Sequence, residues 1–409
     1  AVLKLGAAYL PLDARLPDER LSYMLQDAQP ALLLIQTQHA GRFALSGRRF
    51  VLDDALRQQI NLQSKQPVAL RQPVTADALA YILYTSGTTG QPKAVCQTQR
   101  TVLHLVQAQQ LDETLLTLQF TPLTFDVSIQ ELATAWYTGS CLQLIDAEQK
   151  DNLVHLAQLV QDMAIERLFC PPAVFSLLAE QALQQRLTMT ALQQVIVAGE
   201  ALLITDAISQ FMQLHGNCQL WNHYGPTETH VVTAERVTRF QPGTYASIGM
   251  PVGSSSCLIL DDNQQLLPQG AAGELYVAGP GVALGYLHQP ELTAERFVSL
   301  TWQGGRFYKT GDIVRLTAEN KLQYLGRRDD HADIVHAAGG EGIEGAGAAA
   351  VGLAHGDAVG AGEAALQGIA EGEHRASLAG DERRPVWEQA RAGINRRPAS
   401  KARRRPAPD

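Results

Sequence analysis

Runs rich in apolar residues alternate along most of the chain with segments of helical periodicity. The apolar-rich runs predict buried strands at residues 31–35, 79–84, 195–198 and 219–221. Apolar positions at helical spacing predict helices at residues 17–26, 102–108, 129–137, 152–165 and 205–215. Strands that alternate with helices are typical of a parallel sheet covered by helices. The pattern therefore predicts an α/β fold with mainly parallel sheets flanked by helices.

Some stretches depart from this alternation. Residues 42–75 are polar and glutamine-rich, so we expect a connecting stretch with one strand at 50–52, and residues 120–128 are expected to be strand and loop. Asp151 is the candidate N-cap of the helix expected at 152–165. From about residue 256, short strands and turns predict hairpins. We therefore expect a smaller β-rich subdomain at about 256–325 beside an α/β part that ends near 255.

Residues 331–409 differ in composition from the rest of the chain. They hold thirteen of the 34 glycines, few large aliphatic residues and an arginine- and proline-rich end. A segment of this kind buries too little apolar surface to fold stably. We interpret it as an Ala/Gly/Arg-rich tail that is disordered or out of frame, with a reading-frame shift near Asp330 as one hypothesis and a genuine linker as the alternative.

Length, charge and cysteine content limit the classes of function. The 409 residues are 45% apolar, which suits a globular protein with large cores. A net charge of −8 argues against a nucleic-acid partner held by bulk electrostatics. No apolar run approaches the ~18 residues of a membrane span, so we expect no membrane partner. Five scattered cysteines suggest free thiols in a reducing compartment, and the cytoplasm is the expected location.

The stretch Leu79–Lys93 carries the first chemical signal. A strand leads into six small or hydroxyl residues, Thr85–Gly90, and then into Pro92 and Lys93. Backbone N–H groups, hydroxyls and a lysine together suit a polyphosphate, and glycines allow the close approach of the backbone. The Walker pattern is absent because no Gly-Lys-Ser/Thr follows. Taken alone, Gly-x-x-Gly is more typical of a polar turn than of a phosphate site.

The full string resembles the phosphate loop of adenylate-forming enzymes, the superfamily of acyl-CoA synthetases, luciferases and nonribosomal peptide synthetase adenylation domains. Other stretches match the adenylation family in the expected order over residues 2–330. These stretches are Lys4–Asp13, Phe125–Ser128, Asn222–Glu228, Gly273–Leu287, Tyr308–Asp312 and Gly326–Asp329. Ala94 is a mild departure, since relatives usually have glycine there.

The resemblance implies a truncated adenylation core at 1–325, a hinge at 326–330 and a C-terminal lid that is absent or scrambled. By the same resemblance, we expect that the segment preceding Ala1 in relatives is absent. From His331 onward the family pattern is lost, and Lys401 does not resemble the lysine that the lid brings to the substrate. We therefore expect this polypeptide to be impaired as an enzyme.

The resemblance also implies ATP and Mg²⁺ as cofactors, with the substrate carboxylate attacking the α-phosphate. Lys93, Thr227 and Glu228 take the catalytic roles: Thr227 contacts the α-phosphate, and Glu228 helps to hold Mg²⁺. Tyr224 stacks on adenine, Asn222 bonds its amine and Asp312 accepts the ribose hydroxyls. The full set of implied nucleotide-binding residues is Thr85, Ser86, Gly87, Thr88, Thr89, Gly90, Gly199, Glu200, Ala201, Asn222, Tyr224, Asp312, Tyr324 and Arg327.

The acyl pocket separates the substrate classes. Family members that use α-amino acids carry an aspartate at the position of Asp126, where it pairs with the substrate ammonium. The other implied pocket residues are mostly apolar, which excludes charged side chains. The set is Asp126, Val127, Gln130, Phe169, Ile196, Ala198, His223, Val231 and Val232. It resembles that of proline-activating domains, so we expect proline or a substituted proline, with His223 and Gln130 orienting Asp126 or the amine.

The predicted function is ATP-dependent activation of an amino acid as its aminoacyl adenylate in nonribosomal peptide synthesis. By resemblance the partners are the peptidyl carrier and condensation domains of a parent synthetase, with phosphopantetheine on the separate carrier domain. Two alternatives stay open. One is an acyl- or aryl-CoA ligase, against which Asp126 argues, and the other is a non-catalytic nucleotide-binding remnant.

Overall fold

The computed structural model describes residues 1–42, 48–66, 68–70, 73–86, 91–328 and 353–354. These residues belong to one compact unit, 1–356. The five cysteines are free thiols. No helix among the described residues is long and apolar enough to cross a membrane.

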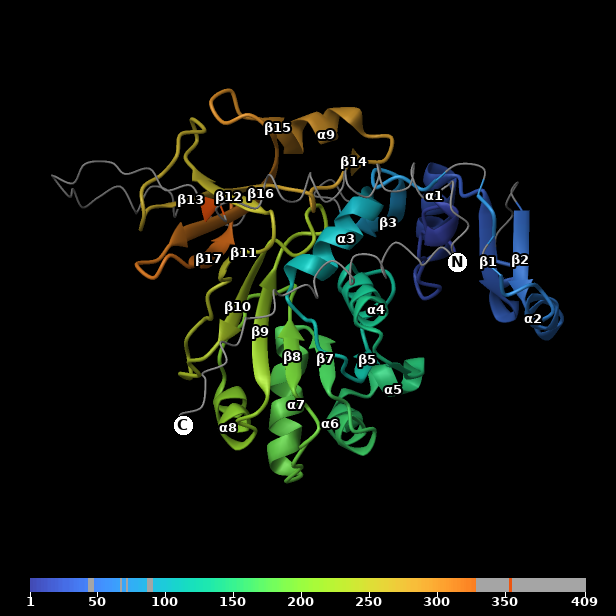
Figure 1. Cartoon of the computed structure of the whole chain (residues 1–409), viewed down its shortest axis with the longest axis horizontal. Helices are drawn as coiled ribbons and strands as arrows, with labels where there is room; N and C mark the ends of the chain where they lie inside the picture. The colour runs from blue at the N-terminus through green and yellow to red at the C-terminus, as the bar shows by residue number, and fades with distance from the viewer. Residues whose placement is uncertain (43–47, 67, 71–72, 87–90, 329–352, 355–409) are drawn as a thin grey trace, which may run out of the picture. The chain divides into compact units, whose positions relative to one another are not determined.

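A seven-stranded sheet forms the centre of this unit (Figure 1). Its strands, in spatial order, are β11 (Met250–Pro251), β10 (Thr233–Val237), β9 (Gln219–Tyr224), β8 (Gln194–Val197), β7 (Arg167–Cys170), β5 (Thr117–Gln119) and β6 (Leu142–Leu144). The five strands from β9 to β6 are parallel, whereas β10 and β11 pair antiparallel. The predicted α/β class with a mainly parallel sheet is therefore confirmed.

Helices cover this sheet and supply its apolar core. They are α3 (Gln99–Ala108), α4 (Val127–Thr138), α5 (Ala147–Asp151), α6 (Leu153–Asp162), α7 (Pro172–Gln184) and α8 (Asp206–Leu214). In Figure 1, α6, α7 and α8 follow one another along the sheet, and neighbouring members of the three are in contact. Phe175 and Phe211 from α7 and α8 pack edge to face with their ring centroids 5.7 Å apart. Apolar faces at helical spacing thus bury the strands, as the sequence pattern predicts.

An antiparallel sheet forms the β-rich part expected from residue 256 on. Its order is β15 (Phe297–Ser299), β16 (Arg306–Leu316), β13 (Ala272–Ala278), β12 (Ser256–Leu260) and β18 (Leu353–Ala354), with β17 (Leu322–Arg327) paired to β16. Leu275, Val277 and Val314 are fully buried between these strands. Of the expected tail 331–409, only residues 353–354 are described.

A smaller sheet joins both halves of the sequence, because β14 (Gly285–Tyr286) pairs with β4 (Lys93–Thr98), and β4 pairs with β3 (Leu79–Thr85). Towards the N-terminus lie η1 (Leu3–Leu5), α1 (Asp18–Ala28), β1 (Leu32–Gln36), η2 (Thr37–His39) and β2 (Arg48–Leu52), and α9 (Pro290–Arg296) follows β14. The predicted strand at 79–84 is confirmed. The sequence analysis missed β4, so the loop after β3 connects two antiparallel strands rather than a strand and a helix.

Three local predictions are wrong. The predicted helix at 152–165 is present as α6, but Asp151 is the last residue of α5 and Asn152, not Asp151, is the N-cap position of α6. The strand placed at 120–128 lies earlier, at β5. The polar stretch 42–75 contains a helix, α2 (Asp54–Asn61), whose N-cap Asp53 accepts a bond from the Leu56 N–H. This helix holds few apolar residues, so its N-cap is the clearest local signal for it.

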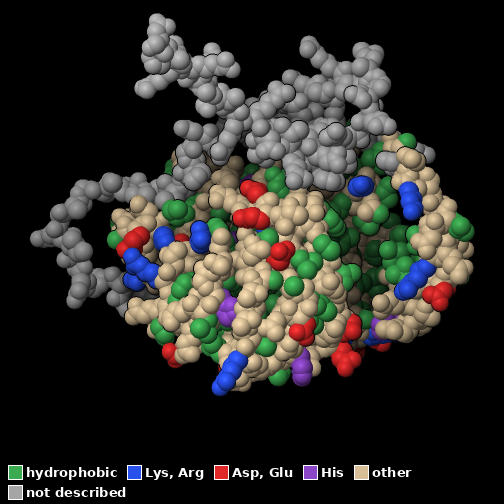
Figure 2. Space-filling view, turned by 60° about the horizontal axis from the view of Figure 1, so that its bottom comes forward, with side chains coloured by type: hydrophobic (Ala, Val, Ile, Leu, Met, Phe, Trp, Pro, Cys, Tyr) green, Lys and Arg blue, Asp and Glu red, His purple; other side chains and the backbone are tan. Residues whose placement is uncertain are grey.

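On the face shown in Figure 2, acidic and basic side chains are interspersed rather than gathered by sign.

Candidate functional site

The candidate site lies where the parallel strands end. Ala198 and Gly199 follow β8, Gly225 follows β9, and Asp126 precedes α4. The carboxyl ends of parallel strands meet at one edge of a sheet, where open α/β folds bind ligands. Residues from three separate parts of the sequence therefore converge at this edge.

Lys93 forms the centre of a polar cluster with two residues that are distant in the sequence. Its Nζ donates to Glu228 Oε1 at 2.6 Å and to the Tyr286 hydroxyl at 3.1 Å. The Tyr286 hydroxyl in turn donates to Glu228 Oε1 at 2.8 Å. The ammonium also lies 4.7 Å from the centroid of the Tyr286 ring, within the range of a cation–π contact. We call Lys93, Glu228 and Tyr286 the lysine cluster.

Burial and charge act in opposite directions on Glu228. Burial disfavours the charged carboxylate, but the Lys93 charge and the bonds from Lys93 and Tyr286 outweigh it, so the pKa of Glu228 lies below its usual value. The same surroundings raise the pKa of Tyr286, with burial as the largest cause and the Glu228 charge next. Glu228 is therefore an ionised carboxylate, and Tyr286 keeps its proton as a donor.

A second polar group joins the two sheets. The Tyr224 hydroxyl donates to Asp312 Oδ2 at 2.5 Å, and Arg327 Nη1 donates to Asp312 Oδ1 at 2.8 Å. Burial raises the pKa of Asp312 despite these two bonds. The rings of Tyr224 and Tyr324 lie 6.5 Å apart between centroids. The structure thus brings together four residues that were predicted to hold adenosine.

The other residues predicted to contact the nucleotide fall into four groups. Asn222 is buried and donates its amide to the Ser247 carbonyl at 2.8 Å, and the Thr227 carbonyl accepts from Gln97 Nε2 at 2.8 Å. Gly199, Glu200 and Ala201 form an exposed segment directly after β8. Thr85 ends β3 and Ser86 is exposed. Gly87, Thr88, Thr89 and Gly90 lie outside the described residues.

A small enclosed pocket contains most of the predicted acyl site. Its lining is Asp126, Val127, Gln130, Ala198, Gly199, His223, Tyr224, Gly225, His230 and Val231. Six of these residues were predicted as pocket residues, and two more, Gly199 and Tyr224, were predicted to contact the nucleotide. The pocket for the acyl group and the residues for the nucleotide are therefore contiguous.

The remaining three predicted pocket residues lie behind this lining or apart from it. Phe169 and Ile196 are fully buried and pack with Leu111 against Val127, so they form the apolar wall behind Val127. Val232 packs instead into the core of the β-rich sheet with Ile248 and Cys257. The alternation of side chains along an extended segment explains this, because the neighbouring Val231 points the other way, into the pocket.

Sequence reasoning missed Tyr286 and His230. Tyr286 stands in the quoted motif Gly273–Leu287, so that motif was its only signal. His230 follows Glu228 by two residues, and nothing in the sequence pattern distinguishes it from a surface histidine. Its backbone carbonyl contacts the loop after β9 closely: a Cβ on Gly225 would lie 1.6 Å from the His230 oxygen. Only glycine fits at that position.

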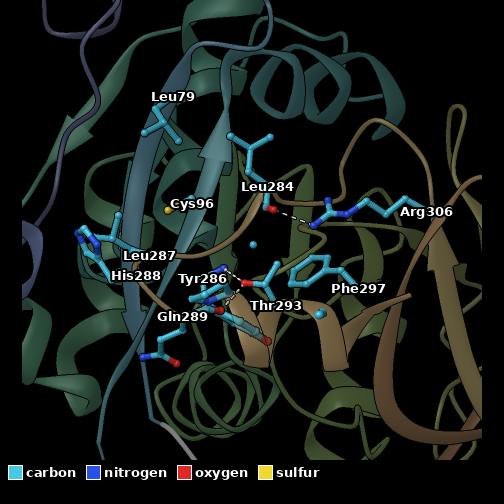
Figure 3. A pocket seen from close by; sticks show the side chains of 13 residues that line it. Leu79, Cys96, Leu284, Tyr286, Leu287, His288, Gln289, Thr293, Phe297 and Arg306 are labelled. Atoms are coloured by element: carbon cyan, nitrogen blue, oxygen red, sulfur yellow. Dashed lines mark hydrogen bonds between the residues drawn. The ribbon is translucent and has the colours of Figure 1, made fainter. Parts of the chain in front are cut away.

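A larger pocket of about 590 Å³ lies elsewhere, between β14, α9 and β15 (Figure 3). Its lining is largely apolar and includes Cys96, Phe297 and Leu284, whose carbonyl accepts from the Arg306 guanidinium. Tyr286 lines it, but the other residues of the lysine cluster do not. The larger pocket therefore touches the lysine cluster only through Tyr286.

The described residues contain no group of three or more His, Cys, Asp or Glu side chains that could hold a metal ion by themselves. Mg²⁺ is usually held by one or two carboxylates together with substrate phosphates and waters. The single ionised Glu228 suits that arrangement.

Comparison with known proteins agrees with this architecture. The family model of AMP-binding enzymes matches residues 1–287, and the chain belongs to this family of AMP-forming ligases. By structure, it resembles the Klebsiella oxytoca NpsA N-terminal subdomain in complex with 3-hydroxybenzoyl-AMSN. That match has a TM-score of 0.68 and 25% identity over 80% of this chain and 82% of that one. The nonribosomal peptide synthetase FmoA3 matches with a TM-score of 0.72 and 28% identity, over 80% of this chain and 35% of that one.

Curated relatives are much longer than this chain. Tyrocidine synthase 2 of Brevibacillus parabrevis is 35% identical over 81% of this chain, which spans 9% of that protein. The dimodular nonribosomal peptide synthase of Bacillus subtilis is 36% identical over 81% of this chain, which spans 14% of it.

Proposed function

We propose that this chain is an adenylation domain that activates an amino acid with ATP in nonribosomal peptide synthesis. The observation that carries the proposal is the continuity of the two half-sites: Asp126 lines the same pocket as Tyr224, and Tyr224 holds Asp312. An amine bound at Asp126 and a nucleoside bound at Asp312 therefore lie side by side. The names of the relatives, which are peptide synthases, support the same activity.

The reaction joins the two bound molecules. A carboxylate oxygen of the amino acid attacks the α-phosphorus of ATP, and the bond to pyrophosphate breaks. Negative charge develops on the phosphoryl oxygens, so fixed cations and donors lower the barrier. Lys93, with the loop residues Thr85–Gly90, holds the β- and γ-phosphates, and Thr227 contacts the α-phosphate. Mg²⁺, when bound at Glu228, neutralises phosphate charge.

Binding of the triphosphate has to reorganise the lysine cluster. Lys93 Nζ is held by Glu228 and Tyr286, so it exchanges at least one of these partners for a phosphate oxygen. An oxygen of Glu228 that is released from Lys93 would be free to hold Mg²⁺. Tyr286 contacts both groups and keeps them near their working positions.

The nucleoside half-site positions the sugar and the base. Asp312 accepts from the ribose hydroxyls, with Tyr324 and Arg327 close to the same sugar. Tyr224 presents its ring to adenine, Asn222 bonds the adenine amine, and Gly199, Glu200 and Ala201 border the base.

We propose proline or a substituted proline as the amino acid. Asp126 is the carboxylate of a pocket whose wall is otherwise apolar or neutral, with Val127, Ala198 and Val231 in the lining and Phe169 and Ile196 behind it. A small apolar ring matches this lining, and besides Asp126, which pairs with the substrate ammonium, the lining offers no second charge for a charged side chain.

We further propose the domain limits and partners. Residues 1–325 form the adenylation core, 326–330 the hinge and 331–409 the tail outside the family pattern. The product passes to phosphopantetheine on a peptidyl carrier domain, beside a condensation domain, in the cytoplasm. The NpsA N-terminal subdomain was crystallised with 3-hydroxybenzoyl-AMSN, which supports ligand binding by a core of this extent.

Pyrophosphate exchange with an amino-acid panel tests the proposal on the full chain. We expect slow exchange that depends on proline, and Asp126→Ala should abolish the preference for an amine. Asp112→Ala, an exposed aspartate outside the pocket, is the matched control and should leave exchange unchanged.

Each other result points to an alternative. Exchange with leucine or phenylalanine equal to that with proline overturns the proline assignment. Exchange with aryl or fatty acids favours an acyl- or aryl-CoA ligase. ATP binding without any exchange favours a non-catalytic remnant, which the loss of the family pattern from His331 also favours.

A further inference from the structure

Glu131 is a fully buried carboxylate on α4, the helix that Asp126 precedes. Its Oε1 accepts from the Thr121 N–H at 2.9 Å and from the Phe120 N–H at 3.2 Å. Its Oε2 accepts from Gln119 Nε2 at 3.0 Å. These donors belong to the last residue of β5 and to the turn that follows it. Glu131 therefore fastens the start of the turn between β5 and α4 to the helix.

Ser128 fastens the other end of this turn to the same helix. Its hydroxyl donates to the Phe125 carbonyl at 2.6 Å, and its N–H donates to the same carbonyl at 3.1 Å. Within the turn, the Phe125 N–H donates to the Pro122 carbonyl at 3.0 Å. Asp126, which lines the acyl pocket, directly follows Phe125. The position of Asp126 on α4 thus depends on both fastenings, and of the two only Glu131 titrates.

The orientation of the Gln119 amide is fixed from two sides. Lys150 Nζ on α5 donates to Gln119 Oε1 at 2.7 Å, and Gln119 Nε2 also donates to the Thr121 carbonyl at 2.6 Å. An ammonium only donates and a carbonyl only accepts, so the nitrogen of this amide faces Glu131. Both oxygens of Glu131 therefore face N–H donors. A neutral Glu131 has to carry its hydrogen on one of them, and the bond at that oxygen is weakened.

Burial opposes the ionised form that these donors favour. It raises the pKa of Glu131 to about 7, although the hydrogen bonds act in the other direction. Among the described residues, the other titratable groups that face it are Lys150 on α5 and Cys170 on β7. Burial lowers the pKa of Lys150 while the Glu131 charge raises it, so their attraction favours both charges. Burial, with the Glu131 charge, keeps Cys170 a neutral thiol by raising its pKa.

We propose that Glu131 is a positioning residue for the amino-acid half-site: its carboxylate holds the turn 121–125 on α4 and so keeps Asp126 in place for the substrate ammonium. The inference rests on the proposed function and adds a dependence on pH to it. When Glu131 gains a proton, the turn loses part of its attachment, and the amino acid has to order Asp126 as it binds. Amino-acid affinity therefore decreases as the pH falls through about 7. The nucleoside half-site at Asp312 belongs to other strands and is unaffected.

Calorimetry at pH 6 and pH 8 with a non-hydrolysable L-prolyl adenylate analogue tests the inference on the full chain. Glu131→Gln keeps the shape of the side chain and one acceptor oxygen, but its amide nitrogen faces an N–H donor at every pH. At pH 8 the analogue should bind the wild type about tenfold more tightly than the variant, the lower end of what a hydrogen bond to a charged group contributes. At pH 6 the ratio should be about twofold, because Glu131 is then largely protonated in the wild type.

Proton release gives a readout that a merely structural role does not move. The analogue favours the ionised form of Glu131, so binding near pH 6.5 should release roughly half a proton more from the wild type than from Glu131→Gln. Titrations in buffers with different heats of ionisation measure this difference. Lys150→Met removes a charge that favours ionised Glu131, so its affinity should begin to fall at a higher pH than that of the wild type.

Glu166→Gln is the matched control. Glu166 Oε2 accepts from the Leu116 N–H at 2.6 Å, just before β5 begins, so it secures the opposite end of the same strand with the same kind of bond. Its replacement should change neither analogue affinity nor proton release. AMP affinity should be the same in the wild type and in every variant, since AMP does not contact the amino-acid half-site.

The inference is overturned by an affinity ratio between the wild type and Glu131→Gln that is the same at pH 6 and pH 8, or by equal affinities at pH 8. An equal fall in AMP affinity in Glu131→Gln also overturns it, because the effect then extends to the nucleoside half-site. If AMP binds the wild type and the prolyl analogue binds no more tightly than AMP at either pH, the proposed function fails and the inference fails with it.

Discussion

The lysine cluster and the histidine side of the acyl pocket both bury polar groups, but these groups are hydrogen-bonded in the cluster and partly unbonded in the pocket. In the lysine cluster, Lys93, Glu228 and Tyr286 bond one another, and opposite charges meet at 2.6 Å. In the pocket, His223 Nε2, His230 Nε2 and Gln130 Oε1 have no partner among the described residues. The two groups meet in the segment between β9 and β10, which carries both Glu228 and His230.

This difference indicates how each half-site prepares for its ligand. A satisfied cluster stabilises the protein alone, and a ligand must displace internal bonds to enter. Unsatisfied buried groups cost stability, and a ligand with complementary atoms recovers that cost. A phosphate therefore has to replace existing hydrogen bonds of the lysine cluster. An amino acid can instead supply hydrogen bonds that the pocket residues lack.

The largest effect is expected from removal of the Lys93 charge, which takes away the hydrogen-bonded character of the lysine cluster. Lys93→Ala leaves the buried Glu228 carboxylate unpaired, so we expect the free energy of unfolding at pH 7 to fall by about 4 kcal/mol. Without Lys93, burial raises the pKa of Glu228, and its neutral form becomes populated as the pH falls. The loss should therefore shrink between pH 8 and pH 5 in urea titrations.

Lys309→Ala is the matched control for that prediction. Lys309 pairs with the buried Glu274 at 3.8 Å, but Arg328 bonds the same carboxylate at 2.8 Å and remains after the substitution. Its loss should be well under 1 kcal/mol. Equal losses in the two variants would show that Glu228 is no more dependent on Lys93 than Glu274 is on Lys309.

The pH dependence of stability tests the histidine side of the acyl pocket. Burial, with the nearby His230, lowers the pKa of His223 to about 3, against about 6.5 in an unfolded chain. The unfolded state thus binds the proton first, and stability present above pH 6.5 is lost as the pH falls. Urea unfolding from pH 7 to pH 5 should cost the wild type about 2 kcal/mol more than His223→Gln. If the wild type and His223→Gln lose the same unfolding free energy, the protonation that causes the loss occurs at another residue.

The smallest expected effect comes from the Tyr286 hydroxyl. Tyr286→Phe keeps the ring under Lys93 and removes one donor to Glu228, so unfolding free energy should fall by about 1 kcal/mol. Tyr245→Phe, on an exposed tyrosine, should change it by less than about 0.5 kcal/mol. Chemical denaturation at pH 7 measures both. If Tyr286→Phe leaves the free energy of unfolding unchanged, the Tyr286 hydroxyl does not stabilise the lysine cluster.

Local pattern was sufficient for elements whose apolar faces are buried. The strand expected at 79–84 is β3, and the helix expected at 205–215 is α8, with Thr205 as its N-cap. It failed where polar groups decide the boundary. Asp151 ends α5 instead of capping the helix expected at 152–165, and β4 follows the glycine-rich loop as a strand because it pairs with β3 and β14.

The chain by itself determined the family, the class of fold and the residue types of the site, because motifs and periodicity are local properties of the sequence. Tertiary structure decided which of these residues meet. Lys93 and Glu228 lie 135 positions apart, and only the sheet of β14, β4 and β3 brings Tyr286 to both. The fold likewise brings His230 into the same pocket as Asp126. Whether a buried N–H finds an acceptor depends on every chain segment packed around it, and no short stretch of sequence records that.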